Sequence, residues 1–213
     1  MIPREFAGPL KKIVRRFLSL APKLKVVPSA ASFREPGISA FVRVKNEEYW
    51  IRPCLTSISR FVDEIVVVDH GSTDSTLAVV QSVGEEINIP VRIHSRPDLD
   101  HCQISNIAIA ECRYRWLLKW DADFIAHTTG KHSLQHLRDY IMRLDPNCYY
   151  MVFMQLVNLA GDLRHQPLDR CAVIRSPGQV HKEAYLWSYM PDIYYRWNDY
   201  KGISKVESLI IPP

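Results

Sequence analysis

Residues 64–69 read Glu-Ile-Val-Val-Val-Asp, and this short β-branched run constrains the fold more than any other feature of the sequence. Such residues favour strands, and a strand without polar alternation is typical of a sheet covered on both faces. Gly71 follows and permits a tight turn, and the polar side chains of residues 72–74 can cap a helix that runs to Val83. The segment therefore predicts one strand–turn–helix unit of an α/β protein.

The alternation of strand and helix extends along the chain from residue 38. Besides 64–69, the predicted strands are 38–44, 91–94 and 117–120, and the predicted helices are 47–61, 102–112 and 134–144. This order predicts a single α/β domain with a mostly parallel central sheet flanked by helices. Further strands are predicted at 149–157 and 170–175, joined by a hairpin-like connection at 161–162, so we expect an antiparallel edge.

Residues 1–37 are predicted to form an arm ahead of a domain that spans residues 38–213. Prolines punctuate the arm, and residues 10–18 place apolar side chains at helical spacing with basic side chains between them. A basic amphipathic helix can bind an anionic membrane interface, and it can equally dock on its own domain or on a neighbouring chain. We expect a cytoplasmic protein with peripheral membrane contact through residues 10–18.

Charge and cysteine content argue against several classes of protein. The first 25 residues hold seven basic side chains and one acidic one, which leaves 20 basic and 22 acidic residues in the remainder. Without excess positive charge, the domain is not expected to bind nucleic acid. The five cysteines form no Cys-x-x-Cys pair, which argues against a zinc cluster or a disulfide scaffold. No apolar run approaches the ~20 residues that span a bilayer.

Polar residues follow three of the predicted strands: Asn46 and Glu47, Asp69, and the tripeptide Asp121-Ala122-Asp123. Because parallel strands end at the same edge of a sheet, these side chains are expected to converge there. The chain has neither a Gly-x-Gly-x-x-Gly motif nor a P-loop, so a bound phosphate would have to be held through a metal. Paired carboxylates that share Mg²⁺ or Mn²⁺ with a diphosphate suit that role.

These motifs resemble the family-2 glycosyltransferases of the GT-A fold. Residues 38–55 look like the family's opening strand and Asn-Glu-Glu turn, and residues 64–76, EIVVVDHGSTDST, resemble its "VVDDGSTD-T" signature. Ser105 and Asn106, together with residues 117–123, are similar to its "R/S-N … L-D-A-D" stretch. The resemblance covers roughly residues 38–130, with the motifs in the family's order and spacing.

The resemblance implies inverting transfer of a sugar from a UDP- or dTDP-linked donor to an acceptor hydroxyl of a glycan or a lipid-linked acceptor. By position, Asp69 would contact the nucleoside, and Asn46 and Glu47 would shape its pocket. Asp121 would lie by the ribose or the metal, and Asp123 would ligate Mn²⁺ or Mg²⁺. His70 stands where many relatives have a second Asp, so the sequence does not decide which nucleotide base of the donor this chain recognises.

Inversion needs a general base within hydrogen-bond reach of the acceptor hydroxyl. Candidate acids are Asp169, Glu183 and Asp199. Glu183 is favoured because residues 178–183 look like a "G-x-V-H-E" segment of some relatives, although Lys182 is inserted. His181 of the same segment could supply a further metal ligand.

Two other functions stay open on the sequence alone. A sugar-phosphate nucleotidyltransferase normally has a Gly-rich loop after its first strand, where this chain has Lys45-Asn46-Glu47. A non-catalytic domain would bind a nucleotide-sugar and turn nothing over. Residues 38–213 are short for a complete enzyme of this kind, so we expect a minimal member or the catalytic domain of a longer polypeptide.

Overall fold

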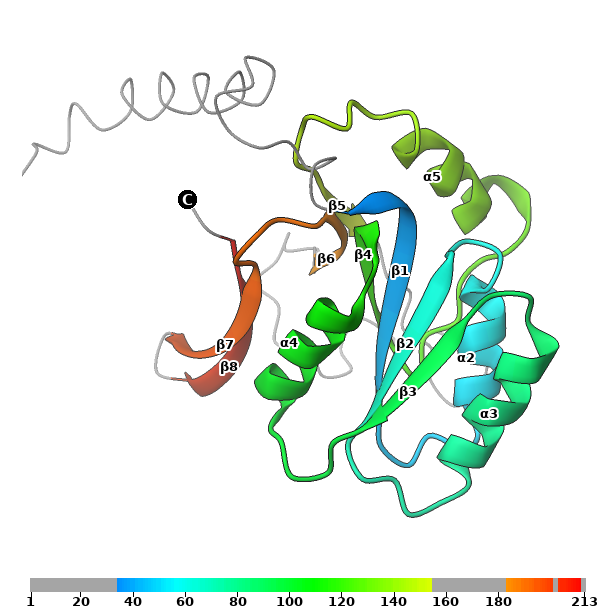
Figure 1. Ribbon diagram of the computed structural model, residues 1–213, viewed down its shortest axis with the longest axis vertical. Coiled ribbons are helices and arrows are strands. Elements are labelled where there is room, and N and C mark those ends of the chain that lie inside the picture. The colour runs from blue at the N-terminus through cyan, green and yellow to red at the C-terminus, as the bar shows by residue number, and fades with distance from the viewer. Residues whose placement is uncertain (1–33, 155–182, 201–202, 212–213) are drawn as a thin grey trace, which may run out of the picture.

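The computed structural model describes residues 34–154, 183–200 and 203–211. Its central sheet has six strands in the order β3-β2-β1-β4-β6-β5 (Figure 1). The strands are β1 (Glu35–Val44), β2 (Glu64–Asp69), β3 (Val91–Ser95), β4 (Tyr114–Asp121), β5 (Met151–Met154) and β6 (Glu183–Ser188). A separate antiparallel hairpin consists of β7 (Tyr194–Tyr200) and β8 (Ile203–Ile210).

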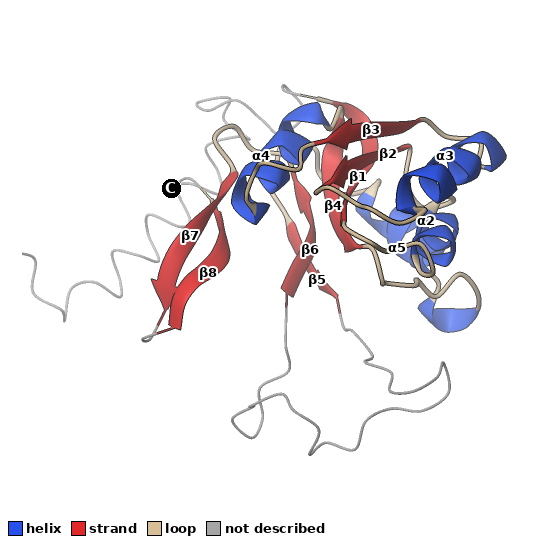
Figure 2. Cartoon of the chain, turned by 90° about the horizontal axis from the view of Figure 1, so that it is seen from below, coloured by secondary structure: helices blue, strands red, loops and turns tan. Residues whose placement is uncertain are grey.

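The four described α-helices cover both faces of the sheet: α2 (Ile51–Ile58), α3 (Thr76–Glu86), α4 (His101–Glu111) and α5 (Leu134–Ile141). A 3₁₀ turn, η3 (Gly130–His132), precedes α5. Helices α2, α3 and α5 lie on one side, and α4 lies with the β7–β8 hairpin on the other (Figure 2). No helix in the described ranges has the length and apolarity that crossing a membrane requires.

Alternate residues of the buried strands supply two apolar cores. On β1, Ile38, Ala40 and Val42 pack toward the first group of helices, and Phe41 packs toward α4. All six residues of β2 are buried, which confirms the strand predicted to be covered on both faces. Period-two side-chain alternation in a strand sandwiched by helices accounts for this arrangement.

Strand β1 is the hub of the sheet because it pairs in parallel with β2 on one side and with β4 on the other. Its residue Val44 pairs with Asp69, and Arg43 pairs with Asp121. The chain runs outward from β1 through β2 to β3 and then returns to β4 on the opposite side. The topological switch point, where ligands bind in such sheets, therefore lies between β1 and β4.

The expected antiparallel edge is present, but β6 forms it. Strand β6 pairs antiparallel with both β4 and β5, and every other strand of this sheet runs in one common direction. The sequence did not predict β6, β7 or β8 as strands. The predicted strand 170–175 and the connection at 161–162 lie outside the described residues, as does the predicted helix 10–18.

Several predicted boundaries were wrong, and two of them bear on the site. The first domain strand begins at Glu35, three residues before the predicted start at Ile38. Helix α2 begins at Ile51 and not at Glu47, because Asn46 has a left-handed φ of 57° and the residues after it form a turn. This turn carries several of the predicted site residues.

A buried carboxylate, Glu64, ties four strands together at the edge opposite the polar strand ends. Its side chain is 1% exposed and accepts hydrogen bonds from Ser39 Oγ at 2.6 Å and from the Arg113 backbone N–H at 2.6 Å. The Arg92 guanidinium lies 2.9 Å from its other oxygen. These contacts link β1, β2, β3 and the start of β4, and they give both oxygens of the buried carboxylate a partner.

Replacing Glu64 with Ala should lower the free energy of unfolding by about 3 kcal/mol, because removing one partner of a buried ion pair leaves the other uncompensated. Urea denaturation followed by circular dichroism measures the change. Glu86→Ala is the matched control, since Glu86 pairs with Arg52 at 2.6 Å on the exposed surface and should change stability little. Equal effects of the two variants would contradict this role of Glu64.

Candidate active site

The loops after β1 and β2 are locked together by side-chain hydrogen bonds. The Asn46 backbone N–H donates to Ser72 Oγ at 3.0 Å, and the Thr73 N–H donates to Asn46 Oδ1 at 2.8 Å. The Glu47 N–H donates to Thr76 Oγ1 at 2.7 Å. Ser72 and Thr73, which were predicted as possible helix caps, hold Asn46 instead, and α3 begins only at Thr76.

Glu48 and Asp74 extend this lock. The Glu48 N–H donates to Asp74 Oδ2 at 3.3 Å, and the Ser75 N–H donates to Glu48 Oε2 at 3.0 Å. Asp74 Oδ1 also accepts from the Thr76 N–H at 3.0 Å, although Asp74 precedes the N-cap of α3, which is Ser75 and has no side-chain capping hydrogen bond. The two loops consequently form one rigid rim along the sheet edge.

Asp69 is buried at the end of β2, with 1% of its surface exposed. Its carboxylate accepts from the backbone N–H groups of Gly71 at 3.1 Å and Ser72 at 3.0 Å, and from Ser95 Oγ at 3.2 Å. Gly71 has a φ of +80°, and an added Cβ there would lie 3.0 Å from Pro97 Cβ. The carboxylate therefore shapes the turn that the predicted nucleoside pocket would use.

The tripeptide at 121–123 turns out of the sheet directly after β4. The Asp121 carbonyl accepts from the Phe124 N–H at 3.0 Å and from Cys54 Sγ at 3.5 Å, which attaches the turn to α2. Ala122 is buried, whereas Asp123 is exposed. The two carboxylates therefore sit in different surroundings, one at the sheet edge and one toward solvent.

Glu47 and Asp123 lie close enough to influence each other electrostatically. The pKa of the Glu47 carboxyl is raised, first by partial burial and then by the negative charges of Asp123 and Asp74. The pKa of the Cys54 thiol is also raised, by burial and by the charges of Asp123, Asp121 and Glu47. Because β1 and β4 pair in parallel, Glu47, Asp121 and Asp123 follow them at one sheet edge, and their negative charges act together there.

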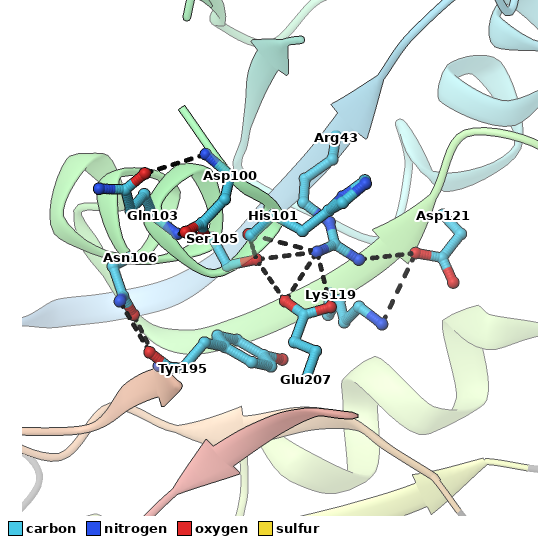
Figure 3. Close-up of polar contacts among 10 residues, drawn as sticks. All are labelled: Arg43, Asp100, His101, Gln103, Ser105, Asn106, Lys119, Asp121, Tyr195 and Glu207. Atoms are coloured by element: carbon cyan, nitrogen blue, oxygen red, sulfur yellow. Dashed lines mark hydrogen bonds and ion pairs between the residues drawn. The ribbon is translucent and has the colours of Figure 1, made fainter. Parts of the chain in front are cut away.

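Asp121 has two cationic neighbours. Its Oδ1 lies 3.7 Å from Lys119 Nζ and 3.9 Å from Arg43 Nη2 (Figure 3). Arg43 in turn binds Glu207 of β8. Arg43, Lys119 and Glu207 were not among the predicted site residues, yet one signal was visible: Arg43 is the only charged residue between Ile38 and Val44.

His70, the departure from the family pattern, follows Asp69 at the same edge. Its ring packs edge-to-face on the ring of His101, with centroids 5.1 Å apart. Its backbone N–H donates to the Val44 carbonyl at 2.9 Å, and its Nδ1 is buried without a hydrogen-bond partner among the described residues. The pKa of His101 is lowered, first by burial and then by the charges of Arg43 and His70.

Of the three candidate general bases, Glu183 and Asp199 lie within the described residues. Glu183 begins β6 and pairs with Met154 of β5, while the pairing of β6 with β4 covers only residues 186–188 of β6. Asp199 lies on β7 and is exposed. Asp169 and His181 fall outside the described residues.

The carboxylates at this edge fit a metal ion that is coordinated partly by the protein and partly by a bound nucleotide diphosphate. Within the ranges that the structure describes, no three His, Cys, Asp or Glu side chains gather into a metal-binding group. Mg²⁺ or Mn²⁺ on a nucleotide diphosphate needs only one or two protein carboxylates, because phosphate oxygens and water complete its shell. The neighbouring carboxylates of Glu47 and Asp123 match this smaller requirement.

Comparison with known proteins identifies the family. A model described as Glycosyl transferase family 2 matches residues 39–173, more than half of the chain. The chain belongs to glycosyl transferase family 2. The match spans all three polar strand ends of the parallel sheet, and it confirms the resemblance found in the sequence.

This family-2 chain aligns with only part of each of its curated relatives. An uncharacterized glycosyltransferase of Rickettsia typhi is 28% identical over 139 residues, which are 63% of this chain and 44% of the relative. The lipopolysaccharide core biosynthesis glycosyltransferase LpsC of Rhizobium meliloti is 37% identical over 86 residues, 40% of this chain and 31% of LpsC. The chain therefore matches less than half of each of these relatives.

Similar solved structures include two glycosyltransferase complexes. S. aureus TarS with UDP-GlcNAc is 24% identical, with a TM-score of 0.40, over 49% of this chain and 30% of that chain. Mycobacterium tuberculosis glucosyl-3-phosphoglycerate synthase with Mn²⁺, UDP and phosphoglyceric acid is 28% identical, with a TM-score of 0.37, over 46% and 36%.

The electrostatic contact between Glu47 and Asp123 can be tested without a ligand. Asp123→Asn should lower the pKa of Glu47 toward its ordinary value, because a neighbouring negative charge is removed. Carbon-13 NMR of labelled Glu side chains over a pH titration measures this shift. Asp139→Asn, on the exposed face of α5, serves as the control, and an unchanged Glu47 pKa in Asp123→Asn would show that the two carboxylates are not neighbours.

Proposed function

We propose that this family-2 domain catalyses metal-dependent, inverting transfer of a sugar from a nucleotide-diphospho-sugar, UDP- or dTDP-linked, to an acceptor hydroxyl. The observation that carries the proposal is the parallel pairing of β1 with β2 and β4, which brings Glu47, Asp121 and Asp123 to the same sheet edge as the turn that Asp69 holds. They meet at the carboxyl ends of parallel strands, at the switch point where α/β sheets bind ligands.

Each polar strand end has a proposed role. Asn46, Glu47 and the Asp69 turn form the nucleoside pocket, and Asp121 binds the ribose or the metal. Asp123 ligates Mn²⁺ or Mg²⁺ on the diphosphate. The bound cation would neutralise the charge that builds on the leaving diphosphate, and that is its contribution to the chemistry.

The acceptor side is proposed to be formed by the antiparallel edge. The general base is proposed to be Glu183, with Asp169 as the alternative, and the proposal is supported by the pairing of β6, which begins at Glu183, with β4, which ends at Asp121. A base there would remove the proton of the acceptor hydroxyl as that hydroxyl attacks the sugar. His181, two residues earlier, is proposed as a further metal ligand.

The acceptor is proposed to be a glycan or a lipid-linked glycan in polysaccharide synthesis. The similarity to LpsC, which is described as a lipopolysaccharide core biosynthesis enzyme, supports this class of acceptor. A cytoplasmic location with peripheral membrane contact through residues 10–18 would bring the domain to such an acceptor.

Calorimetric titration tests donor binding. UDP, dTDP and GDP are titrated into the protein with and without Mn²⁺, and we expect one of the first two to bind much more tightly when Mn²⁺ is present. In Asp123→Asn the Mn²⁺-dependent affinity should fall at least about tenfold, as loss of a carboxylate at a metal site implies. Glu85→Gln, an exposed carboxylate on α3, should bind as the wild type does.

Product analysis separates the proposed reaction from its two alternatives. A transferase releases nucleoside diphosphate from the donor and forms a glycoside of inverted configuration. A nucleotidyltransferase would instead release sugar phosphate when pyrophosphate is added, and a non-catalytic domain would bind donor and release nothing. Absence of nucleotide binding with every combination of nucleotide and metal would overturn the proposal.

A further inference from the structure

The guanidinium of Arg43 lies between two carboxylates that come from distant parts of the chain. Its Nη1 donates to Glu207 at 2.7 Å to Oε1 and 2.8 Å to Oε2, and to Ser105 Oγ at 3.0 Å (Figure 3). Its Nη2 faces Asp121 at 3.9 Å. The Arg43 and Glu207 side chains are only 15% and 19% exposed, so their pairing is largely sheltered from solvent.

The β7–β8 hairpin carries Glu207 to this position and is itself fixed to α4. Asn106 Nδ2 donates to the Tyr195 carbonyl at 2.9 Å, and the Tyr195 N–H donates to Asn106 Oδ1 at 2.6 Å. Ser105 Oγ lies 2.8 Å from Glu207 Oε1. The adjacent residues 105 and 106, which belong to one of the family-like motifs, therefore hold both strands of the hairpin.

The two carboxylates compete for one cation, and the distances show which of them holds it. A guanidinium forms its strongest contact with a carboxylate as a hydrogen-bonded pair at about 2.8 Å. Glu207 has this contact, whereas Asp121, at 3.9 Å from Arg43 and 3.7 Å from Lys119, is near both cations without hydrogen bonding to either. Asp121 thus gains electrostatic support while its oxygens are not used by Arg43.

We propose that Glu207 is a positioning residue that holds Arg43 away from Asp121, so that the Asp121 carboxylate stays available to the donor nucleotide. This rests on the proposed function for the role of Asp121. Without the charge of Glu207, Arg43 is expected to turn toward Asp121, where it would form the close ion pair that now joins it to Glu207 and would block the binding oxygens.

The first test is the Glu207→Gln variant, which keeps the size of the side chain and removes its charge. A crystal structure should show an Arg43 nitrogen within about 2.9 Å of Asp121, the usual length of such a pair. Calorimetry should show a rise of about tenfold in the dissociation constant of the nucleotide diphosphate that the wild type binds with Mn²⁺, a usual size for coupling between sites.

The double variant Arg43→Gln/Glu207→Gln separates positioning from simple loss of structure. With residue 43 neutral, no guanidinium competes for Asp121, and Lys119 is unchanged from the wild type, so the double variant should recover most of the affinity that Glu207→Gln loses. If Glu207 only fastened the hairpin, the second substitution would restore nothing. Asn106→Ala loosens the hairpin without touching Arg43 and should not reproduce the Arg43 shift, and Glu86→Gln controls for loss of an exposed ion pair.

The outcomes are distinguishable from a failure of the proposed function. An Arg43–Asp121 distance that stays near 3.9 Å in Glu207→Gln, or a double variant that binds no better than Glu207→Gln, would overturn the positioning role while wild-type nucleotide binding still supported the function. If the wild type binds no nucleotide, the proposed function fails, and with it the consequence for donor binding. The crystal structure of Glu207→Gln would still decide whether Glu207 controls Arg43.

Discussion

The parallel pairing of β1 with strands on both sides is the constraint on which the rest of the structure depends. Since β2 and β4 both follow the direction of β1, the residues after all three strands must emerge at one edge. The opposite edge is closed by the buried Glu64 contacts, which fix the same strands at their beginnings. Loops that are separated by many residues are consequently held against one another at the site.

The carboxylates at this edge are stabilised in three different ways. Asp69 is satisfied by backbone N–H groups and contributes to shape. Asp121 is balanced by Arg43 and Lys119. Glu47 and Asp123 raise the local negative potential, as the elevated pKa of Glu47 indicates. A divalent cation would therefore be attracted most strongly to the side of the site where the charge is least compensated.

Local sequence signals predicted the parallel part of the fold, whose strands and turns are set by nearby residues. The run at 64–69, the Gly71 turn and the aspartates after β4 all lie where the patterns indicated. The start of α2 was wrong because the left-handed Asn46 is fixed by partners on another loop. Strand β6 and the pairing of Arg43 with Glu207, 164 residues apart, depend on long-range contacts that no local pattern contains.

Glu207 has a consequence for how the boundaries of such domains are drawn. The motifs within residues 38–55, 64–76 and 105–123 all precede β6, yet the counter-charge that orients Arg43 comes from β8. A shortened chain that ended after β6 would keep these motifs and leave the largely sheltered Arg43 guanidinium without Glu207. Domain boundaries chosen from the motifs alone would therefore separate Arg43 and Asp121 from Glu207.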